Sequence, residues 1–257
     1  MSGSGNAVVL LHGQPGSADD WAAVAADLAC DHRVIVPDRL GYGRTGGSPG
    51  GFSANAVAIV KLMDQLGEMT AVVVGHSWAG GTALAMALDF PSRISGLGLV
   101  SSVAPGEPLS RVDRVLALPV LGSALGALAL SAGGRLLTAS PTRALAGMRP
   151  GGRIEALAGL ITSWRQPSTW ASFLHEQRAL VVELPLLGPR LSQLNVPTLV
   201  MAGAVDRIVS VHAGERLAAT IPSALLEVVP NAGHLLPQFE PRVVAAALRR
   251  LVSRTAA

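Results

Sequence analysis

The sequence predicts an α/β fold: a mostly parallel, doubly wound sheet of about six strands, with a helical cap inserted into it. Short apolar runs alternate with stretches of helical period in the first and the last part of the chain, which is the pattern of strand–helix–strand units. The alternation stops between residues 104 and 190, where Ala, Leu, Gly and Arg dominate and no convincing strand is present. The chain has 257 residues, of which 49% are hydrophobic, so it can bury one large core.

The first predicted elements lie close to residue 1. Val8–Leu11 is a continuous apolar run, which is typical of a strand buried on both faces. Asp19–Ala29 has apolar residues at helical spacing, and Val34–Val36 is a second buried strand. After a glycine-rich loop, Ser53 is predicted to cap a helix that continues to Leu66.

The next strand–helix–strand unit is equally clear. Ala71–Val74 is an apolar run that predicts a strand, and Trp78–Leu88 has the composition of a helix. Pro91 closes that helix, and Ile94–Val100 is again typical of a strand.

The same alternation resumes after the insertion. Thr198–Ala202 and Leu225–Val229 are predicted strands, and Val211–Thr220 and Pro241–Val252 are predicted helices. We therefore expect residues 1–103 and 191–257 to form the sheet domain and residues 104–190 to form the cap.

One uncharged stretch of the insertion, Val115–Gly134, is long enough to cross a bilayer. It contains proline and several glycines, and much of the rest is alanine, so it is weakly hydrophobic. We expect buried or groove-lining helices there and no transmembrane span. Contact with a membrane surface is the alternative.

Composition narrows the partners and the location. The net charge of +3, without interleaved aromatic and basic residues, is poor support for nucleic-acid binding. Cys30 is the only cysteine, so an intrachain disulfide is excluded. The N-terminal residues lack the pattern of a secretory signal, and a cytoplasmic location is therefore expected. Nothing in the sequence indicates an oligomeric state.

The stretch GHSWAGG, residues 75–81, follows a predicted strand and contains Ser77. Alone, this serine is either a nucleophile on a sharp turn or an ordinary helix cap. A serine hydroxyl needs a base, and the base needs an orienting group. Asp206 and His234 follow the last two predicted strands, and the carboxyl ends of parallel strands meet at one edge of a sheet. The three residues are therefore expected to lie together.

Four segments resemble the α/β-hydrolase superfamily, of the kind that uses a serine nucleophile and carries a helical cap. They are LLHGQPGS at 10–17, VPDRLGYGRT at 36–45, VVGHSWAGG at 73–81, and GAVDRIV with NAGHLL at 203–209 and 231–236. The resemblance implies Ser77 as the nucleophile, His234 as the general base and Asp206 as its orienting acid. It also implies an oxyanion hole formed by the backbone N–H groups of Gln14 and Trp78. No metal and no cofactor is expected.

Two departures from the family pattern stand out. The family has two strands before the one that ends in His-Gly; only a few residues precede Val8 here, so we do not expect these two strands. The Gly-x-Ser-x-Gly pattern has Ala79 at its fifth position, which we interpret as a tolerated substitution. Relatives with alkyl-enzyme chemistry place an aspartate where Ser77 stands, so that chemistry is not expected.

The substrate is less constrained than the reaction. The resemblance implies an acyl-enzyme on Ser77, and an apolar, arginine-bearing cap favours a small hydrophobic acyl or ester substrate, with an anionic group as an option. We expect a carboxylesterase; a thioesterase, peptidase, lactonase, carbon–carbon hydrolase, acyltransferase or non-catalytic ligand receptor remains an alternative. The weaker candidates for substrate contact are His12, Trp164, Trp170 and Phe173. A structural role is favoured for His12, and a place in the core is favoured for the three aromatic residues.

Overall fold

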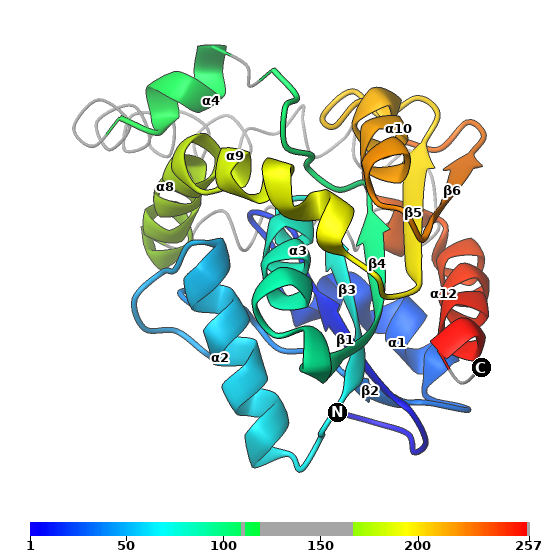
Figure 1. Ribbon diagram of the computed structural model, residues 1–257. Coiled ribbons are helices and arrows are strands. Elements are labelled where there is room, and N and C mark those ends of the chain that lie inside the picture. Colours follow the sequence, from blue (N-terminus) through cyan, green and yellow to red (C-terminus); the bar gives the residue numbers. More distant parts are fainter. Residues whose placement is uncertain (109–110, 119–166, 256–257) are drawn as a thin grey trace, which may run out of the picture.

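The computed structural model describes residues 1–108, 111–118 and 167–255. Within these ranges the fold contains one six-stranded parallel sheet in the order β2-β1-β3-β4-β5-β6, with helices on both faces (Figure 1). The predicted fold class is confirmed. The strands are β1 (Ala7–Leu11), β2 (Arg33–Ile35), β3 (Ala71–His76), β4 (Ile94–Val100), β5 (Thr198–Gly203) and β6 (Ala224–Val229).

The strand register brings the candidate site residues to one edge of the sheet. Near the ends of β1 and β3, Leu11 pairs with Gly75, and at the ends of β3 and β4, His76 pairs with Val100. Gly203 and Val229 pair at the ends of β5 and β6. The loops that leave these strands therefore start from neighbouring points.

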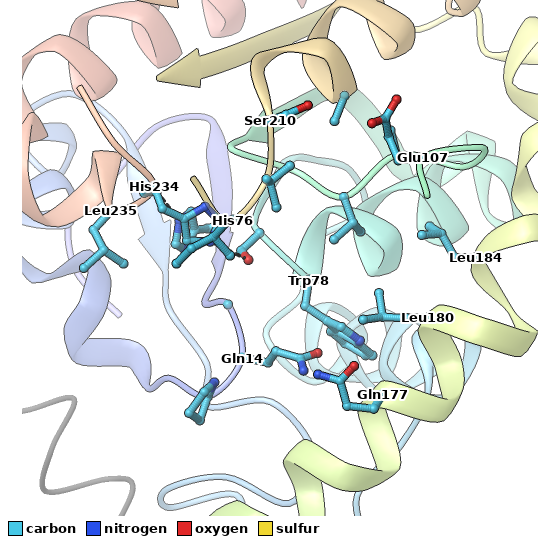
Figure 2. A pocket seen from close by; sticks show the side chains of 18 of the residues that line it. Gln14, His76, Trp78, Glu107, Gln177, Leu180, Leu184, Ser210, His234 and Leu235 are labelled. Atoms are coloured by element: carbon cyan, nitrogen blue, oxygen red, sulfur yellow. Dashed lines mark hydrogen bonds between the residues drawn. The ribbon is translucent and has the colours of Figure 1, made fainter. Parts of the chain in front are cut away.

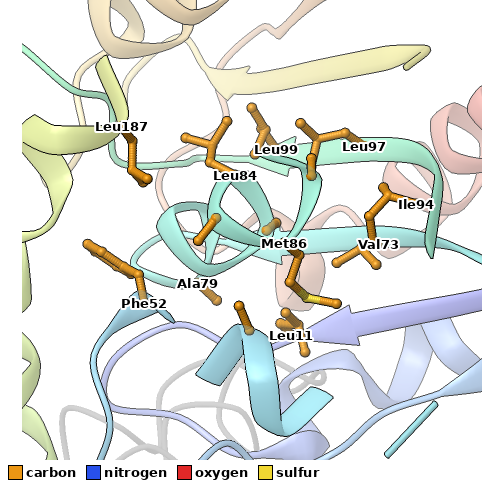
Figure 3. Packing of buried hydrophobic residues seen from close by; sticks show 14 of the residues in the cluster. Leu11, Phe52, Val73, Ala79, Leu84, Met86, Ile94, Leu97, Leu99 and Leu187 are labelled. Atoms are coloured by element: carbon orange, nitrogen blue, oxygen red, sulfur yellow. The ribbon is translucent and has the colours of Figure 1, made fainter. Parts of the chain in front are cut away.

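Two core clusters lie on opposite faces of the sheet, because alternate side chains of a strand point to opposite sides. Val8 and Leu10 of β1 pack with α1 (Ala22–Leu28) and α12 (Pro241–Thr255). Leu11 belongs to the other cluster, which Figure 3 shows together with residues of the helices on that face. Those helices are α2 (Phe52–Gln65), α3 (Ala79–Asp89) and α10 (Val211–Thr220).

Where it is described, the chain between β4 and β5 is helical, and Figure 1 places it over the carboxyl edge of the sheet. It contains α4 (Arg111–Leu116), α8 (Pro167–Val182), α9 (Leu184–Leu187) and the 3-10 helix η3 (Gly188–Gln193). The cap boundaries at residues 104 and 190 stay a prediction. No helix in the described ranges is long and apolar enough to cross a membrane, and most of Val115–Gly134 lies outside them.

The short helices complete the fold: η1 (Ala18–Trp21), η2 (Pro91–Arg93) and α11 (Leu236–Phe239). The prediction that Ser53 caps a helix was wrong. Helix α2 begins one residue earlier, at Phe52, and Gly51 precedes it without a side-chain cap. The carboxylate of Glu183, which comes from the inserted region, accepts the Ser53 N–H at 3.1 Å instead. Sequence proximity could not reveal a cap that comes from so far along the chain.

Candidate active site

Ser77 occupies a tight turn between β3 and α3. Its backbone φ is +54°, in the left-handed region that non-glycine residues rarely adopt. Gly75 is required by the same turn, because a Cβ there would collide with the backbone carbonyl of Ala79. The Ala79 side chain is fully buried in the core cluster with Phe52 and Met86 (Figure 3). A methyl group is therefore accommodated at the fifth position of the pattern.

The structure brings together the three residues predicted as a triad. The Ser77 Oγ lies 2.8 Å from His234 Nε2, and His234 Nδ1 lies 2.8 Å from Asp206 Oδ2. The other Asp206 oxygen accepts the backbone N–H groups of Ile208 and Val209, at 2.8 and 3.0 Å. The Asp206 side chain is 1% exposed and that of His234 is 9% exposed, so water has little access to either.

The electrostatics of this chain of hydrogen bonds fix the proton positions. Burial acts to raise the pKa of Asp206, but the hydrogen bond and charge of His234 and the two backbone donors outweigh it and hold that pKa below its ordinary value. A carboxylate only accepts, so Nδ1 of His234 carries the proton that faces Asp206. Nε2 is then free to accept the hydroxyl proton of Ser77.

His76, beside Ser77, supports the loop that carries His234. Its Nε2–H donates to the backbone carbonyl of His234 at 3.0 Å, and the two imidazole rings are 5.1 Å apart. Burial, and next the charge of His234, lower the pKa of His76 from 6.5 to about 3. His76 is therefore neutral at physiological pH. His76 also lines the cavity that contains Ser77 and His234 (Figure 2).

The predicted oxyanion donors lie beside Ser77. Gln14 is on the loop after β1, and Trp78 directly follows the serine. Both line the same cavity as Ser77 and His234. In the described part of the chain, neither backbone N–H donates to a backbone carbonyl, so both can bind an incoming oxygen.

A buried ion pair, which we call the Arg39–Glu176 pair, connects this loop to α8. Both side chains are 0% exposed. The Arg39 guanidinium also donates to the carbonyls of His12 and Gly13, at 2.8 and 2.7 Å. On the other side, the Trp78 indole N–H donates to the Glu176 carbonyl at 3.0 Å. The pair thus holds the loop of one predicted oxyanion donor and the side chain of the other.

The aromatic and polar surroundings of the Arg39–Glu176 pair are complete. Tyr42 donates its hydroxyl to Glu176 at 2.7 Å, and the guanidinium lies 4.5 Å from the centre of the Trp78 ring. Burial raises the pKa of Glu176, although the charge and hydrogen bonds of Arg39 oppose this. Every polar group of this cluster has a partner, as buried charges require.

A cavity of about 590 Å³ opens above Ser77, with an apolar wall and a few polar groups (Figure 2). Its apolar wall is formed by Pro15, Trp78, Val103, Ala104, Pro108, Phe173, Leu180, Leu184, Ile208, Val209, Ala213 and Leu235. Its polar groups outside the triad include Gln14, Asp20, Glu107, Gln177, Ser210 and Gln238. No Lys or Arg is among the described lining residues.

Asp20 is an acid in this wall that the sequence reading did not single out. Its carboxylate accepts the Ser17 N–H at 3.2 Å, and the amide of Gln238 also contacts it. Burial raises its pKa from 3.8 to about 6, because these two hydrogen bonds only partly offset the loss of solvation. Ser17 and Asp20 form a capping box, and their spacing of three residues is the sequence feature that could have pointed to Asp20.

Of the weaker candidates for substrate contact that the structure describes, only Phe173 lines the cavity. Phe173 lines the cavity, and Trp170 does not, although their rings pack edge to face at 5.5 Å. His12 does not line the cavity either: its Nε2 accepts the Arg39 N–H and its Nδ1–H donates to the Gly13 carbonyl. Burial and the Arg39 charge keep the pKa of His12 well below its ordinary value, so it is a neutral structural residue. Trp164 lies outside the described residues.

The sequence did not single out two residues of α8: Gln177, which lines the cavity, and Glu176, which pairs with Arg39. They stand next to each other in a helix of mixed polarity, where polar side chains ordinarily face solvent. Only the packing of α8 over the sheet buries them. Within the described ranges, no group of three or more His, Cys, Asp or Glu side chains could hold a metal ion.

Comparison with known proteins gives consistent matches. The sequence profile described as alpha/beta hydrolase fold matches residues 6–241. A 2-hydroxy-6-oxo-6-phenylhexa-2,4-dienoate hydrolase from Burkholderia cepacia is 28% identical over 251 residues, which cover 91% of this chain and 82% of that protein. The structure of a thermophilic esterase from Thermogutta terrifontis has a TM-score of 0.79 and 25% identity, covering 100% of this chain and 92% of that one. The structure of an N-acyl homoserine lactone degrading enzyme has a TM-score of 0.73 and 27% identity, covering 97% and 94%.

Proposed function

The chain belongs to the α/β-hydrolase fold family, and from that premise we propose that it is a serine hydrolase that cleaves uncharged esters through an acyl-enzyme on Ser77. The observation that carries the proposal is the unbroken hydrogen-bond chain from Ser77 through His234 to Asp206, which opens onto an apolar cavity. A hydroxyl becomes an effective nucleophile when a base of this kind is held against it.

In the proposed first half-reaction, Ser77 Oγ attacks the ester carbonyl carbon while His234 Nε2 takes the hydroxyl proton. The carbonyl oxygen becomes an oxyanion, which the backbone N–H groups of Gln14 and Trp78 stabilise. When the carbon–oxygen bond breaks, the leaving alkoxide takes the proton from His234 and departs as an alcohol. Asp206 stabilises the imidazolium that exists between these two proton transfers.

In the second half-reaction, water attacks the acyl-enzyme and His234 accepts its proton. The tetrahedral intermediate then collapses, the proton returns to Ser77 Oγ, and the carboxylic acid leaves. The same five residues therefore act twice, and no cofactor is required by this scheme.

The cavity favours a substrate without a negative charge. Its described wall is mostly apolar, and its charged groups outside the triad, Asp20 and Glu107, are both acids. The relative from Burkholderia cepacia acts on a dienoate, which carries a carboxylate. Because the described wall offers no cation to bind such a group, an uncharged ester is the better candidate, and the anionic option loses support. With a single cysteine, Cys30, a reducing cytoplasm is the proposed location.

The test combines active-site labelling with turnover. The protein would be treated with a fluorophosphonate probe, and p-nitrophenyl esters of increasing acyl length would be assayed for hydrolysis. We expect labelling at Ser77 and a chain-length optimum in kcat/KM. Ser77→Ala should remain folded by circular dichroism and lose both signals, with a fall in kcat of several powers of ten. Full hydrolysis by folded Ser77→Ala would refute the proposal, and stoichiometric labelling without turnover would indicate a ligand receptor.

A further inference from the structure

Two glutamines in the cavity wall have a side-chain oxygen that lacks a hydrogen-bond partner among the described residues. Gln177 of α8 is only 3% exposed, and Gln14 is on the loop after β1. The side-chain oxygen of each is buried without a hydrogen bond. Figure 2 shows both amides directed into the cavity and toward one another, beside Trp78.

The neighbours of Gln177 show that its unpaired state is specific. On the same helix, Ser172 donates to the Gly41 carbonyl at 2.8 Å, and Glu176 is fully bonded to Arg39 and Tyr42. The amide of the third glutamine in the cavity wall, Gln238, contacts the Asp20 carboxylate, although its oxygen is also buried without a hydrogen bond. Buried amides in proteins are ordinarily paired, so an exception directed into a cavity points to a ligand.

The backbone segments that carry both glutamines are held in place. The Arg39–Glu176 pair fixes the turn of α8 that carries Gln177, and the Glu176 carbonyl is bonded to the Trp78 indole. Gln14 is on the loop that Arg39 holds by the carbonyl of Gly13. A binding group built in this way loses little side-chain freedom when a ligand arrives.

We propose that the side-chain amides of Gln14 and Gln177 form a subsite for a secondary amide of the substrate, next to the carbonyl that Ser77 attacks. A secondary amide has one donor and one acceptor, so one glutamine can accept its N–H while the other donates to its carbonyl. The substrate class is then an uncharged ester with an amide near the scissile carbonyl. This inference rests on the proposed function.

The proposed subsite would discriminate between esters with and without an amide. Water can bond to both glutamines before a substrate binds, but an alkyl chain would displace that water and leave two amides unpaired. Sites with buried hydrogen-bonding groups reject analogues that lack the matching group far more strongly than apolar pockets do. An amide-bearing ester should therefore be preferred over an alkyl ester of the same shape.

A matched pair of substrates tests this. Methyl N-acetylglycinate and methyl 4-methylpentanoate have the same skeleton of non-hydrogen atoms, and only the first contains an amide. Hydrolysis would be followed by proton release in the wild type, Gln177→Met and Gln14→Met. The control is Gln238→Met, the same substitution at a cavity glutamine whose amide already contacts the Asp20 carboxylate.

We expect the wild type to prefer the amide ester. In Gln177→Met, kcat/KM for the amide ester should fall by about tenfold or more, while kcat/KM for the alkyl ester changes by less than about threefold. Gln14→Met should shift the preference in the same direction and gives the answer if Gln177→Met does not fold. Gln238→Met should leave the ratio of the two kcat/KM values near that of the wild type.

Different results would refute the proposed function and the proposed subsite. If neither ester nor any p-nitrophenyl ester is hydrolysed in a Ser77-dependent way, the proposed function is wrong. If hydrolysis depends on Ser77 but the wild type shows no amide preference, or both methionine variants keep it, only the subsite is overturned. Binding of methyl N-acetylglycinate to Ser77→Ala, followed by ligand NMR, is an independent readout that Gln177→Met should abolish.

Discussion

Two buried titratable groups near the candidate site should change the stability of the protein with pH in opposite directions. His76 has a pKa of about 3 instead of 6.5, and Asp20 has a pKa of about 6 instead of 3.8. The stability that neutral His76 contributes is present above pH 6.5 and is lost as the pH falls toward 3. The stability associated with protonated Asp20 is present below pH 3.8 and is lost as the pH rises through 6.

The sizes follow from these pKa values. Between pH 7 and pH 5, the unfolded chain gains most of a proton at His76 and the folded protein gains almost none, which lowers the free energy of unfolding by about 2 kcal/mol. Over the same interval, the folded protein gains nearly a whole proton at Asp20, which raises that free energy by about 1 kcal/mol.

Two variants test these values: His76→Gln and Asp20→Asn. Each replaces one titratable side chain with an amide that can still form hydrogen bonds. Urea unfolding followed by far-ultraviolet circular dichroism at pH 7, 6 and 5 measures the free energy of unfolding. Relative to the wild type, His76→Gln should lose about 2 kcal/mol less between pH 7 and 5, and Asp20→Asn should lose about 1 kcal/mol more.

The comparison uses differences between pH values, so a constant cost of either substitution cancels. All other titrating groups, His12 included, are common to the three proteins. Equal losses in all three proteins, or shifts of the opposite sign, would refute the reasoning that burial sets these two pKa values.

Further expectations concern the triad, the turn and the Arg39–Glu176 pair. Asp206→Asn should fold and lower kcat for ester hydrolysis by about three to four powers of ten, because His234 loses its orienting carboxylate; near-normal turnover would contradict that role. Ala79→Gly should lower the free energy of unfolding by about 1–2 kcal/mol and leave kcat/KM within about twofold, since the methyl fills core space away from the cavity; a large activity change would contradict the packing account. Glu176→Gln should lower the free energy of unfolding by about 3–5 kcal/mol, because Arg39 is left buried without its carboxylate partner. The double variant Arg39→Met, Glu176→Leu should lower it by less than Glu176→Gln does. If chemical denaturation showed that the losses of the two substitutions simply add, the buried pair would be contradicted.

The sheet was predictable because each buried strand is a compact apolar run. The run Ala71–Val74 located β3, but the strand continues to His76, since glycine and histidine at its end are not apolar. Ser77, Asp206 and His234 could be placed together because each follows a strand, and the carboxyl ends of parallel strands meet at one edge of the sheet.

The remainder of the site depends on packing that no local pattern records. Glu176 and Gln177 belong to a helix whose polar residues are ordinary in type and spacing, and they become buried only when α8 lies over the sheet. Ser53 failed as a helix cap for the same reason, because its partner Glu183 is remote in sequence. Long-range polar contacts are thus the part of this molecule that the sequence reading could not supply.

The Arg39–Glu176 pair also sets where the gene of this protein could be recombined with those of its relatives. A foreign insert that lacked an acid at position 176 would place an unpaired guanidinium under the candidate site and would loosen the loop of Gln14. A junction placed before α8 would retain Glu176, Gln177 and their partners. We therefore expect chimaeras joined just before Pro167 to keep this pair, and chimaeras joined after α8 to lose it.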